Sequence, residues 1–174
     1  MSDPRNQSKY QIRFDWGYDG AALVAPGAHI VVWADALATG DDFDASRIAG
    51  DAAIVAGTVG SAKAVAAWVL EKQVELGDRA TVAVVAAGRD EGCFAVEDLL
   101  AAGAVIDAIS ALGIDFISPE AAAAVGAFAG LRNATSHVLT ASVTGQEIIA
   151  ARGREVIDAA KKANAAESLN VLRP

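Results

Sequence analysis

The sequence is poor in the residues that build disulfide scaffolds and zinc sites. Its 174 residues include one cysteine, Cys93, and two histidines. One thiol cannot form an internal disulfide, and zinc sites in proteins usually need several cysteine or histidine ligands. The composition therefore excludes a disulfide-stapled fold and argues against a zinc site, while the redox compartment stays open.

Basic residues and long apolar runs are scarce as well. Lysine and arginine number 14 against 22 acidic residues, which gives a formal charge of −8. An acidic chain repels nucleic-acid backbones, so no nucleic-acid partner is expected, although one local arginine could still attract a small anion. The uncharged apolar stretches, such as 82–88 and 121–131, are too short to cross a bilayer, and the polar start MSDPRNQSKY has no signal-peptide core. We therefore expect a cytoplasmic protein with no membrane partner.

The remaining composition is that of one globular domain. Apolar residues make up 53% of the chain and charged residues 21%, and no repeat or low-complexity linker divides it. A chain of this length buries about two-thirds of its unfolded surface without staples. We expect a single domain over residues 1–174.

Short apolar runs alternate with amphipathic segments along the first two-thirds of the chain. Runs of this kind predict buried strands, and spacings of three and four predict helices. The run ATVAVVAAG is apolar almost throughout, so it should be an internal strand of a parallel sheet. The expected strands are 10–14, 29–34, 52–57 and 80–88, and the expected helices are 61–76 and 96–112.

The last third of the chain is predicted to be largely helical, from Pro119 to Asn164. A helix start is indicated by Ser118, a capping hydroxyl followed by proline and an acid, and a T-x-x-E capping box is predicted at Thr144. The final NVLRP returns as a short strand in this interpretation. Together these elements predict an α/β fold, namely a three-layer α/β/α sandwich with a mainly parallel sheet and a helical C-terminal third.

Carboxylates stand where ligands bind in such sheets, beyond the carboxyl ends of the strands. Asp35 directly follows the strand HIVVWA, where it could hold Mg²⁺, or it could be a surface turn residue. Glu97 and Asp98 lie in the first turn of a predicted helix. They could bind a hard cation or do acid–base work, or they could only offset the helix dipole.

Two further positions could bind an anion. Arg89 follows the 80–88 strand, where a guanidinium could hold a phosphate or sulfonate, or it could be a solvated loop cation. The turn that contains Thr58, Gly60 and Ser61 joins a strand to a helix, so its N–H groups could attract an anion, or it could be an ordinary capped turn.

Cys93 is a weaker candidate for chemistry. A nucleophilic thiol needs a base to lower its pKa, and the two histidines offer no obvious partner, because His29 enters a strand and His137 lies in the helical tail. A small structural thiol is the favoured interpretation.

Several stretches go beyond a generic α/β pattern. In VAVVAAGRDEGCFAVEDLLAAGAVIDAI a strand ends in Ala-Gly-Arg, and a loop leads to phenylalanine, Glu-Asp and Ala-Gly. This pattern resembles the 2-phosphosulfolactate phosphatase family. The C-terminal SPEAAAAVGAF and ASVTGQEIIAARGREVIDAAKKAN, and the opening IRFDWG and VVWADALAT, are similar to that family as well.

The resemblance implies a Mg²⁺-dependent phosphatase that cleaves a small anionic phosphorylated substrate, 2-phosphosulfolactate, into sulfolactate and phosphate. Carried over by position, Asp35 matches the aspartate of the family's Asp-Val-Leu opening, Arg89 its strand-end arginine, and Glu97 and Asp98 its Glu-Asp pair. In this interpretation Asp35, with one or both of Glu97 and Asp98, would hold the metal and form the catalytic centre, and Arg89 would hold the anion. Mg²⁺ would be the cofactor.

The sequence departs from the family between Gly40 and Ala52, where a short segment replaces a longer one of the size of a βα unit. This departure keeps a second function open: a non-catalytic domain that binds an anion or a protein partner. It also predicts a homo-oligomer, with a homodimer as the favoured form, because the alanine-rich flank of the 52–57 strand would lose its cover. The alternative is that residues 40–51 cover the gap, with Phe43 and Ile48 as plugs.

Overall fold

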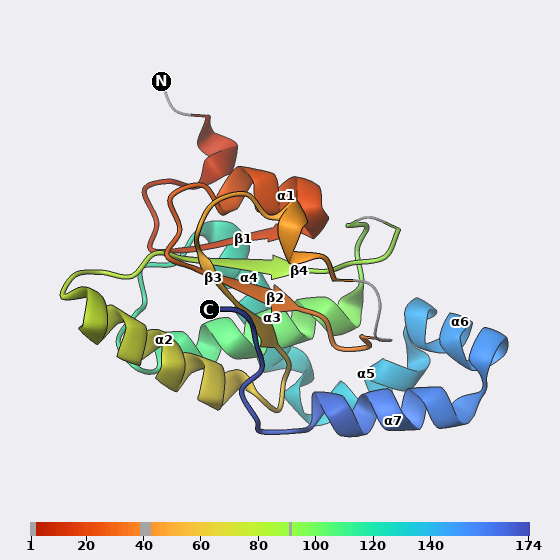
Figure 1. The fold of residues 1–174 in the computed structure, drawn as a ribbon. Helices are drawn as coiled ribbons and strands as arrows, with labels where there is room; N and C mark the ends of the chain where they lie inside the picture. Colours follow the sequence, from red (N-terminus) through yellow and green to blue (C-terminus); the bar gives the residue numbers. More distant parts are fainter. Residues whose placement is uncertain (1–2, 39–42, 91) are drawn as a thin grey trace.

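The computed structural model describes residues 3–38, 43–90 and 92–174 and is built around one mixed sheet (Figure 1). Four strands arise from the predicted apolar runs, and the fifth is the predicted return of the C-terminus. The strands are β1 (Ile12–Trp16), β2 (Ile30–Ala34), β3 (Ala53–Gly57), β4 (Val82–Ala86) and β5 (Val171–Arg173).

The strand order across the sheet is β1-β4-β2-β3-β5. The first four strands are parallel, and β5 runs antiparallel to β3. β4 lies between β1 and β2 with all five residues buried, which explains its nearly unbroken apolar sequence. The mainly parallel sheet and the internal position of β4 are thus confirmed.

Helices cover both faces of the sheet, which confirms the three-layer α/β prediction. Helix α1 packs on the face that carries Val31, Trp33 and Ile54, whereas α2 and α3 bury the opposite face and α4 packs against α3 (Figure 1). The α-helices are α1 (Gly17–Val24), α2 (Ala62–Leu76), α3 (Val96–Ser110), α4 (Pro119–Leu131), α5 (Thr135–Ala141), α6 (Val143–Arg152) and α7 (Arg154–Asn164), and the 3-10 helices are η1 (Pro4–Asn6), η2 (Ala45–Arg47) and η3 (Arg132–Ala134).

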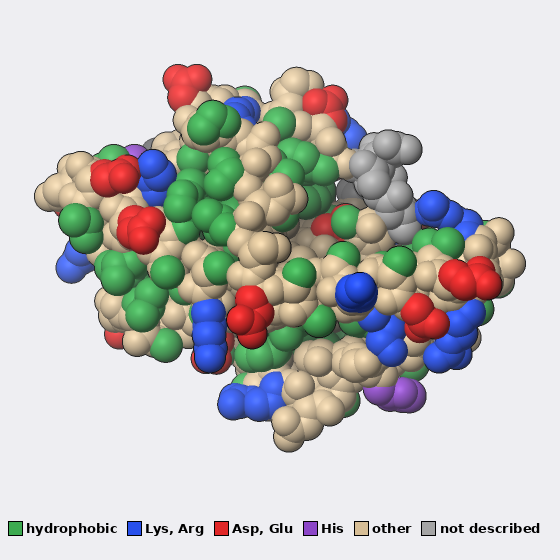
Figure 2. Space-filling model, turned by 60° about the horizontal axis from the view of Figure 1, so that its bottom comes forward, with side chains coloured by type: hydrophobic (Ala, Val, Ile, Leu, Met, Phe, Trp, Pro, Cys, Tyr) green, Lys and Arg blue, Asp and Glu red, His purple; other side chains and the backbone are tan. Residues whose placement is uncertain are grey.

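Helices α4 to α7 form the predicted helical third. Of these, α5 to α7 lie on the side of the molecule toward which the arrows of β1 and β4 point (Figure 1). No helix in the described part of the chain combines the length and the apolar character that a membrane crossing requires. Acidic and basic side chains are interspersed over the face that α2 and α7 present (Figure 2), so this face has no surface of a single charge sign.

Helix starts follow capping chemistry, with one correction. Ser118 caps α4 as predicted, and its hydroxyl accepts a hydrogen bond from the Ala121 N–H at 3.1 Å. The prediction of a capping box at Thr144 is wrong, because α6 already begins at Val143 and its cap is Ser142. The Ser142 hydroxyl accepts from the Gly145 N–H at 3.1 Å. The chain is extended at Ser142 and helical beyond it, so the Thr144 hydroxyl does not cap the helix.

The connection between β2 and β3 packs onto the α1 face of the sheet. Its described residues, 35–38 and 43–52, contain no α-helix and only the short η2. Ile48 is buried at 2% exposure, and the Phe43 ring lies 5.2 Å from the Trp33 ring. The positions of Phe43 and Ile48 agree with the alternative in which the β2–β3 connection itself covers the sheet where the longer family segment is missing. The homo-oligomer stays a prediction.

Candidate functional site

The first candidate site is a cavity at the carboxyl ends of β1, β2 and β4. Because parallel strands end at one edge, side chains far apart in sequence meet there. The cavity has a volume of about 410 Å³, and we call it the arginine pocket after its two cations. Its lining comprises Gly17, Tyr18, Trp33, Asp35, Leu37, Arg47, Ala87, Gly88, Asp90, Thr144, Ile148 and Arg152.

The two arginines reach the pocket from separate elements. Arg47 ends η2, and its guanidinium carbon lies 3.7 Å from the centre of the Tyr18 ring, a cation–π contact that orients the side chain. Arg152 ends α6, the helix that also contributes Thr144 and Ile148 to the pocket. These three residues are spaced by four and therefore share one face of the helix.

Thr144 adds a hydroxyl to the same wall. Its Oγ1 is buried and has no hydrogen-bond partner within the described protein. Two guanidinium groups and one unused hydroxyl thus border a cavity at the strand ends, a set that suits an oxyanion. The sequence analysis did not predict Arg47, Thr144 or Arg152 as site residues. The one available signal was the four-residue spacing of Thr144, Ile148 and Arg152, which places them on one face of a helix.

Asp35 is the predicted carboxylate that the structure places in this pocket. It follows β2 directly, and its Oδ1 accepts a hydrogen bond from the Leu37 N–H at 3.1 Å. The bond folds the strand end into a turn and holds the carboxylate at the cavity wall.

Asp98 ties two strand ends together behind Asp35. Its side chain is 4% exposed, its Oδ1 accepts from the Ala36 N–H and its Oδ2 from the Gly88 N–H, each at 2.9 Å. Ala36 follows β2 and Gly88 follows β4, so one carboxylate joins the loops after both strands. The bonds explain why an acid stands in the first turn of α3 facing the sheet.

The electrostatics of Asp98 are unfavourable to its ionised form. Burial raises the pKa of Asp98 well above the usual range, and the nearby negative charge of Asp35 raises it further. The N–H donors of Ala36 and Gly88 act in the opposite direction, and Glu97 adds to the repulsion. A cation beside Asp35 and Asp98 would relieve this repulsion, so the pair suits a divalent metal.

This arrangement predicts a pH dependence of stability. The folded state holds a proton on Asp98 at pH values where the unfolded chain, with an aspartate pKa near 4, has released it. With metal chelated, the free energy of unfolding should therefore fall as the pH rises from about 4 through the raised pKa of Asp98. Urea denaturation across this range in EDTA checks the prediction. The fall should be smaller in Asp35→Asn, and equal profiles for the two proteins would contradict the coupling.

Glu97 lies apart from this pair. Its side chain is 2% exposed, and both carboxylate oxygens are buried without a hydrogen-bond partner among the described residues. It borders a small space between α3, α5 and α7 that is shared with Thr135, Leu139 and Asn164. Within the described ranges, no three His, Cys, Asp or Glu side chains form a metal-binding group.

The residues at the strand ends nevertheless fit one mode of Mg²⁺ binding. Mg²⁺ keeps several waters and is often held by one or two carboxylates together with substrate phosphate oxygens. Asp35 offers a carboxylate at the pocket wall, and Asp98 stands behind it. Mg²⁺ binding and the ligand role of Glu97 stay predictions.

Arg89 turns toward α6. Its Nη1 lies 4.0 Å from Glu147 Oε1, and its Nε donates to the Phe94 carbonyl oxygen at 3.3 Å. The guanidinium therefore has partners within the chain, and its anion-binding role stays a prediction. Arg47 and Arg152 are the arginines that line the pocket.

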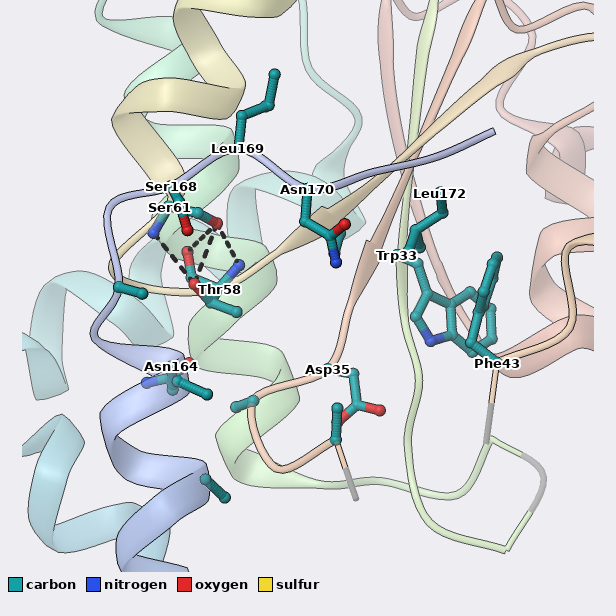
Figure 3. A pocket seen from close by; sticks show the side chains of 16 residues that line it. Trp33, Asp35, Phe43, Thr58, Ser61, Asn164, Ser168, Leu169, Asn170 and Leu172 are labelled. Atoms are coloured by element: carbon teal, nitrogen blue, oxygen red, sulfur yellow. Dashed lines mark hydrogen bonds between the residues drawn. The ribbon is translucent and has the colours of Figure 1, made fainter. Parts of the chain in front are cut away.

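The turn at Thr58, Gly60 and Ser61 is closed by its own hydrogen bonds (Figure 3). The Thr58 N–H donates to Ser61 Oγ at 3.0 Å and the Ser61 N–H to Thr58 Oγ1 at 3.1 Å. The Gly60 N–H donates to the Asn164 carbonyl at 2.9 Å. An anion that used these N–H groups would have to displace these bonds. The Thr58 and Ser61 side chains line a second, larger cavity instead.

Cys93 is exposed, and its backbone rather than its thiol pairs with Arg89. The Arg89 N–H donates to the Cys93 carbonyl at 2.8 Å, a bond that alanine would keep. We expect Cys93→Ala to retain any hydrolytic activity within about twofold, since the substitution leaves this bond and the arginine pocket intact. A large loss of turnover with an unchanged circular dichroism spectrum would show that the thiol takes part.

The fold is that of α/β proteins whose ligands bind at the carboxyl edge of a mainly parallel sheet, and Asp35, Arg47 and Arg152 line one cavity at that edge. The comparison with family models is more specific: residues 44–173 match 2-phosphosulpholactate phosphatase. The chain therefore belongs to the 2-phosphosulpholactate phosphatase family. The matched range includes Arg89, Glu97 and Asp98, whereas Asp35 precedes it. A search of curated proteins found no match.

Proposed function

We propose that the chain hydrolyses a small phosphate monoester in the arginine pocket with the help of Mg²⁺. The observation that carries the proposal is the position of Asp35, a strand-end carboxylate in the same cavity as Arg47 and Arg152. Membership of the phosphatase family supports the reaction type.

The division of charge in the pocket suits phosphoryl transfer. Arg47 and Arg152 would bind the phosphate oxygens, and the free hydroxyl of Thr144 adds a neutral donor. Asp35 would hold Mg²⁺, with Asp98 behind it fixing the ends of β2 and β4 through two N–H bonds. When bound, Mg²⁺ would neutralise phosphate charge and favour attack by water.

The reaction balances with water alone. The oxygen of a water molecule bonds to phosphorus, the ester P–O bond breaks, and the leaving oxygen takes up a proton. For 2-phosphosulfolactate, the substrate that the family name suggests, the products are sulfolactate and inorganic phosphate.

Phosphate release from an aryl phosphate and from 2-phosphosulfolactate, with Mg²⁺ or with EDTA, tests the proposal. Release should require Mg²⁺ and should fall at least about tenfold in Arg152→Ala, because a charge-assisted contact to the phosphate is lost. The matched control is Arg154→Ala, an exposed arginine of α7 that pairs with Asp158 at 3.9 Å. Binding of phosphate without turnover of either ester would favour the non-catalytic alternative.

A further inference from the structure

The backbone of η2, which brings Arg47 to the arginine pocket, is held in place by other parts of the chain. Ile48 follows η2, and its side chain is buried. The guanidinium of Arg173, in β5, donates to the carbonyl oxygens of Ala45 and Ile48 at 3.3 and 3.1 Å. These contacts fix the backbone around Arg47, and none of them involves the Arg47 side chain.

The Arg47 side chain itself is exposed and has few partners. Within residues 3–38, 43–90 and 92–174, its guanidinium forms no ion pair and no hydrogen bond. The contact that holds it is the ring of Tyr18, whose centre lies 3.7 Å from the guanidinium carbon. A cation–π contact uses the charge of a guanidinium but none of its N–H donors, so these donors remain available to an oxyanion.

The Tyr18 ring is fixed against both the sheet and η2. Its centre lies 4.7 Å from the ring of Trp33, a β2 residue that is 5% exposed. The Phe43 ring contacts Trp33 in turn, at 5.2 Å (Figure 3). The Tyr18 hydroxyl oxygen accepts a hydrogen bond from the Asp44 N–H at 2.6 Å, and Asp44 is the N-cap of η2. One side chain thus connects the sheet, the start of η2 and the guanidinium at its end.

We infer that Tyr18 is a positioning residue for anion binding, because it holds the Arg47 guanidinium at the arginine pocket before the anion arrives. A free arginine side chain would lose conformational freedom on binding, and a contact that orders it beforehand removes that cost from the affinity. The inference rests on the proposed function for the role of Arg47 in binding phosphate. It implies that Tyr18 affects phosphate affinity through Arg47 alone.

A double-mutant cycle between Tyr18 and Arg47 tests this dependence, with calorimetric titration of inorganic phosphate in the presence of Mg²⁺. Arg47→Ala should weaken phosphate binding at least about tenfold, and Tyr18→Leu, which removes the ring, should weaken it about fivefold. In the Arg47→Ala background, Tyr18→Leu should add no more than about twofold, because the group that Tyr18 positions is gone. A purely structural role of Tyr18 would give the full loss in both backgrounds.

Two further variants separate the ring from the hydroxyl and from general packing. Tyr18→Phe keeps the ring and should bind phosphate within about twofold of wild type, although it loses the bond to the Asp44 N–H. Tyr10→Leu is the matched control and should leave phosphate affinity unaltered. The Tyr10 ring lies 5.3 Å from the Phe116 ring and 4.8 Å from Lys9 Nζ, but Tyr10 precedes β1, at the end of the sheet opposite the arginine pocket.

The NMR resonance of the Arg47 Nε–H, assigned by its loss in Arg47→Ala, reports the contact itself. A guanidinium over an aromatic ring has a ring-current shift, which should be present in wild type and Tyr18→Phe and absent in Tyr18→Leu. An unshifted resonance in wild type, wild-type affinity in Tyr18→Leu, or equal losses from Tyr18→Leu with and without Arg47 would overturn the inference. Wild-type affinity in Arg47→Ala would refute the phosphate role of Arg47 and the inference with it. The expected cycle without ester hydrolysis would refute the proposed reaction alone, so the two failures are distinguishable.

Discussion

Replacing Asp35 with asparagine is expected to lower kcat/KM for phosphate ester hydrolysis by about a hundredfold or more and to weaken Mg²⁺ binding. The substitution keeps the size of the side chain and an acceptor for the Leu37 N–H, but it removes the negative charge at the wall of the arginine pocket. Phosphate release and calorimetric Mg²⁺ titration measure the two effects.

Stability measurements and a control variant distinguish a loss of activity in Asp35→Asn from a loss of folding. Asp35→Asn removes a charge that repels Asp98, so in EDTA at neutral pH the variant should be at least as stable as wild type. Asp115→Asn is the matched control, because Asp115 is exposed and lies near Ile117, which pairs with the first residue of β1 at the other end of the sheet. Equal Mg²⁺ affinity in Asp35→Asn and wild type would remove Asp35 from the metal site.

The second large effect concerns the contact between α3 and α4. Gly103 faces α4 so closely that a Cβ atom there would overlap the carbonyl oxygen of Ala124 and lie 2.8 Å from the Cβ of Phe128. Backbone cannot yield as a flexible side chain can, so the helices would have to separate. We expect Gly103→Ala to lower the free energy of unfolding by about 3 kcal/mol, near the upper end of overpacking costs.

Urea denaturation measures this change, and α4 itself provides the control. A Cβ at Gly126 meets no atom within 4 Å, and the residue is exposed inside the helix. Gly126→Ala should therefore stabilise the protein by up to about 1 kcal/mol through helix propensity alone. A loss in Gly103→Ala no larger than about 0.5 kcal/mol would mean that α3 and α4 adjust to the methyl group.

The layers of the fold could be predicted from the sequence because buried positions recur at the spacing of the strand or helix that carries them, and those positions are apolar. A strand covered on both faces, such as β4, must be apolar at nearly every position, and a cap such as Ser118 uses local chemistry. The Thr144 cap was a wrong prediction because Ser142, two residues earlier, already supplies the capping hydroxyl of α6.

The candidate site was less predictable because its parts depend on packing. Neighbouring residues on a helix point in different directions, so Glu97 and Asp98 separate in space although they adjoin in sequence. Asp98 faces the ends of β2 and β4, whereas Glu97 faces α5 and α7. Arg47 and Arg152 line one cavity although the first lies in the β2–β3 connection and the second ends α6, so only the tertiary structure brings them to it.

The end of the chain also bears on how the protein is made. The guanidinium of Arg173, in β5, donates to the carbonyls of Ala45, Ile48 and Ala52, at 3.3, 3.1 and 2.9 Å respectively. More than a hundred residues separate these partners in sequence. During translation the edge of β3 and the β2–β3 connection therefore await a partner until residues 171–173 have left the ribosome. The cavity that Ser168 and Asn170 line beside β3 can therefore close only after the last strand has been synthesised.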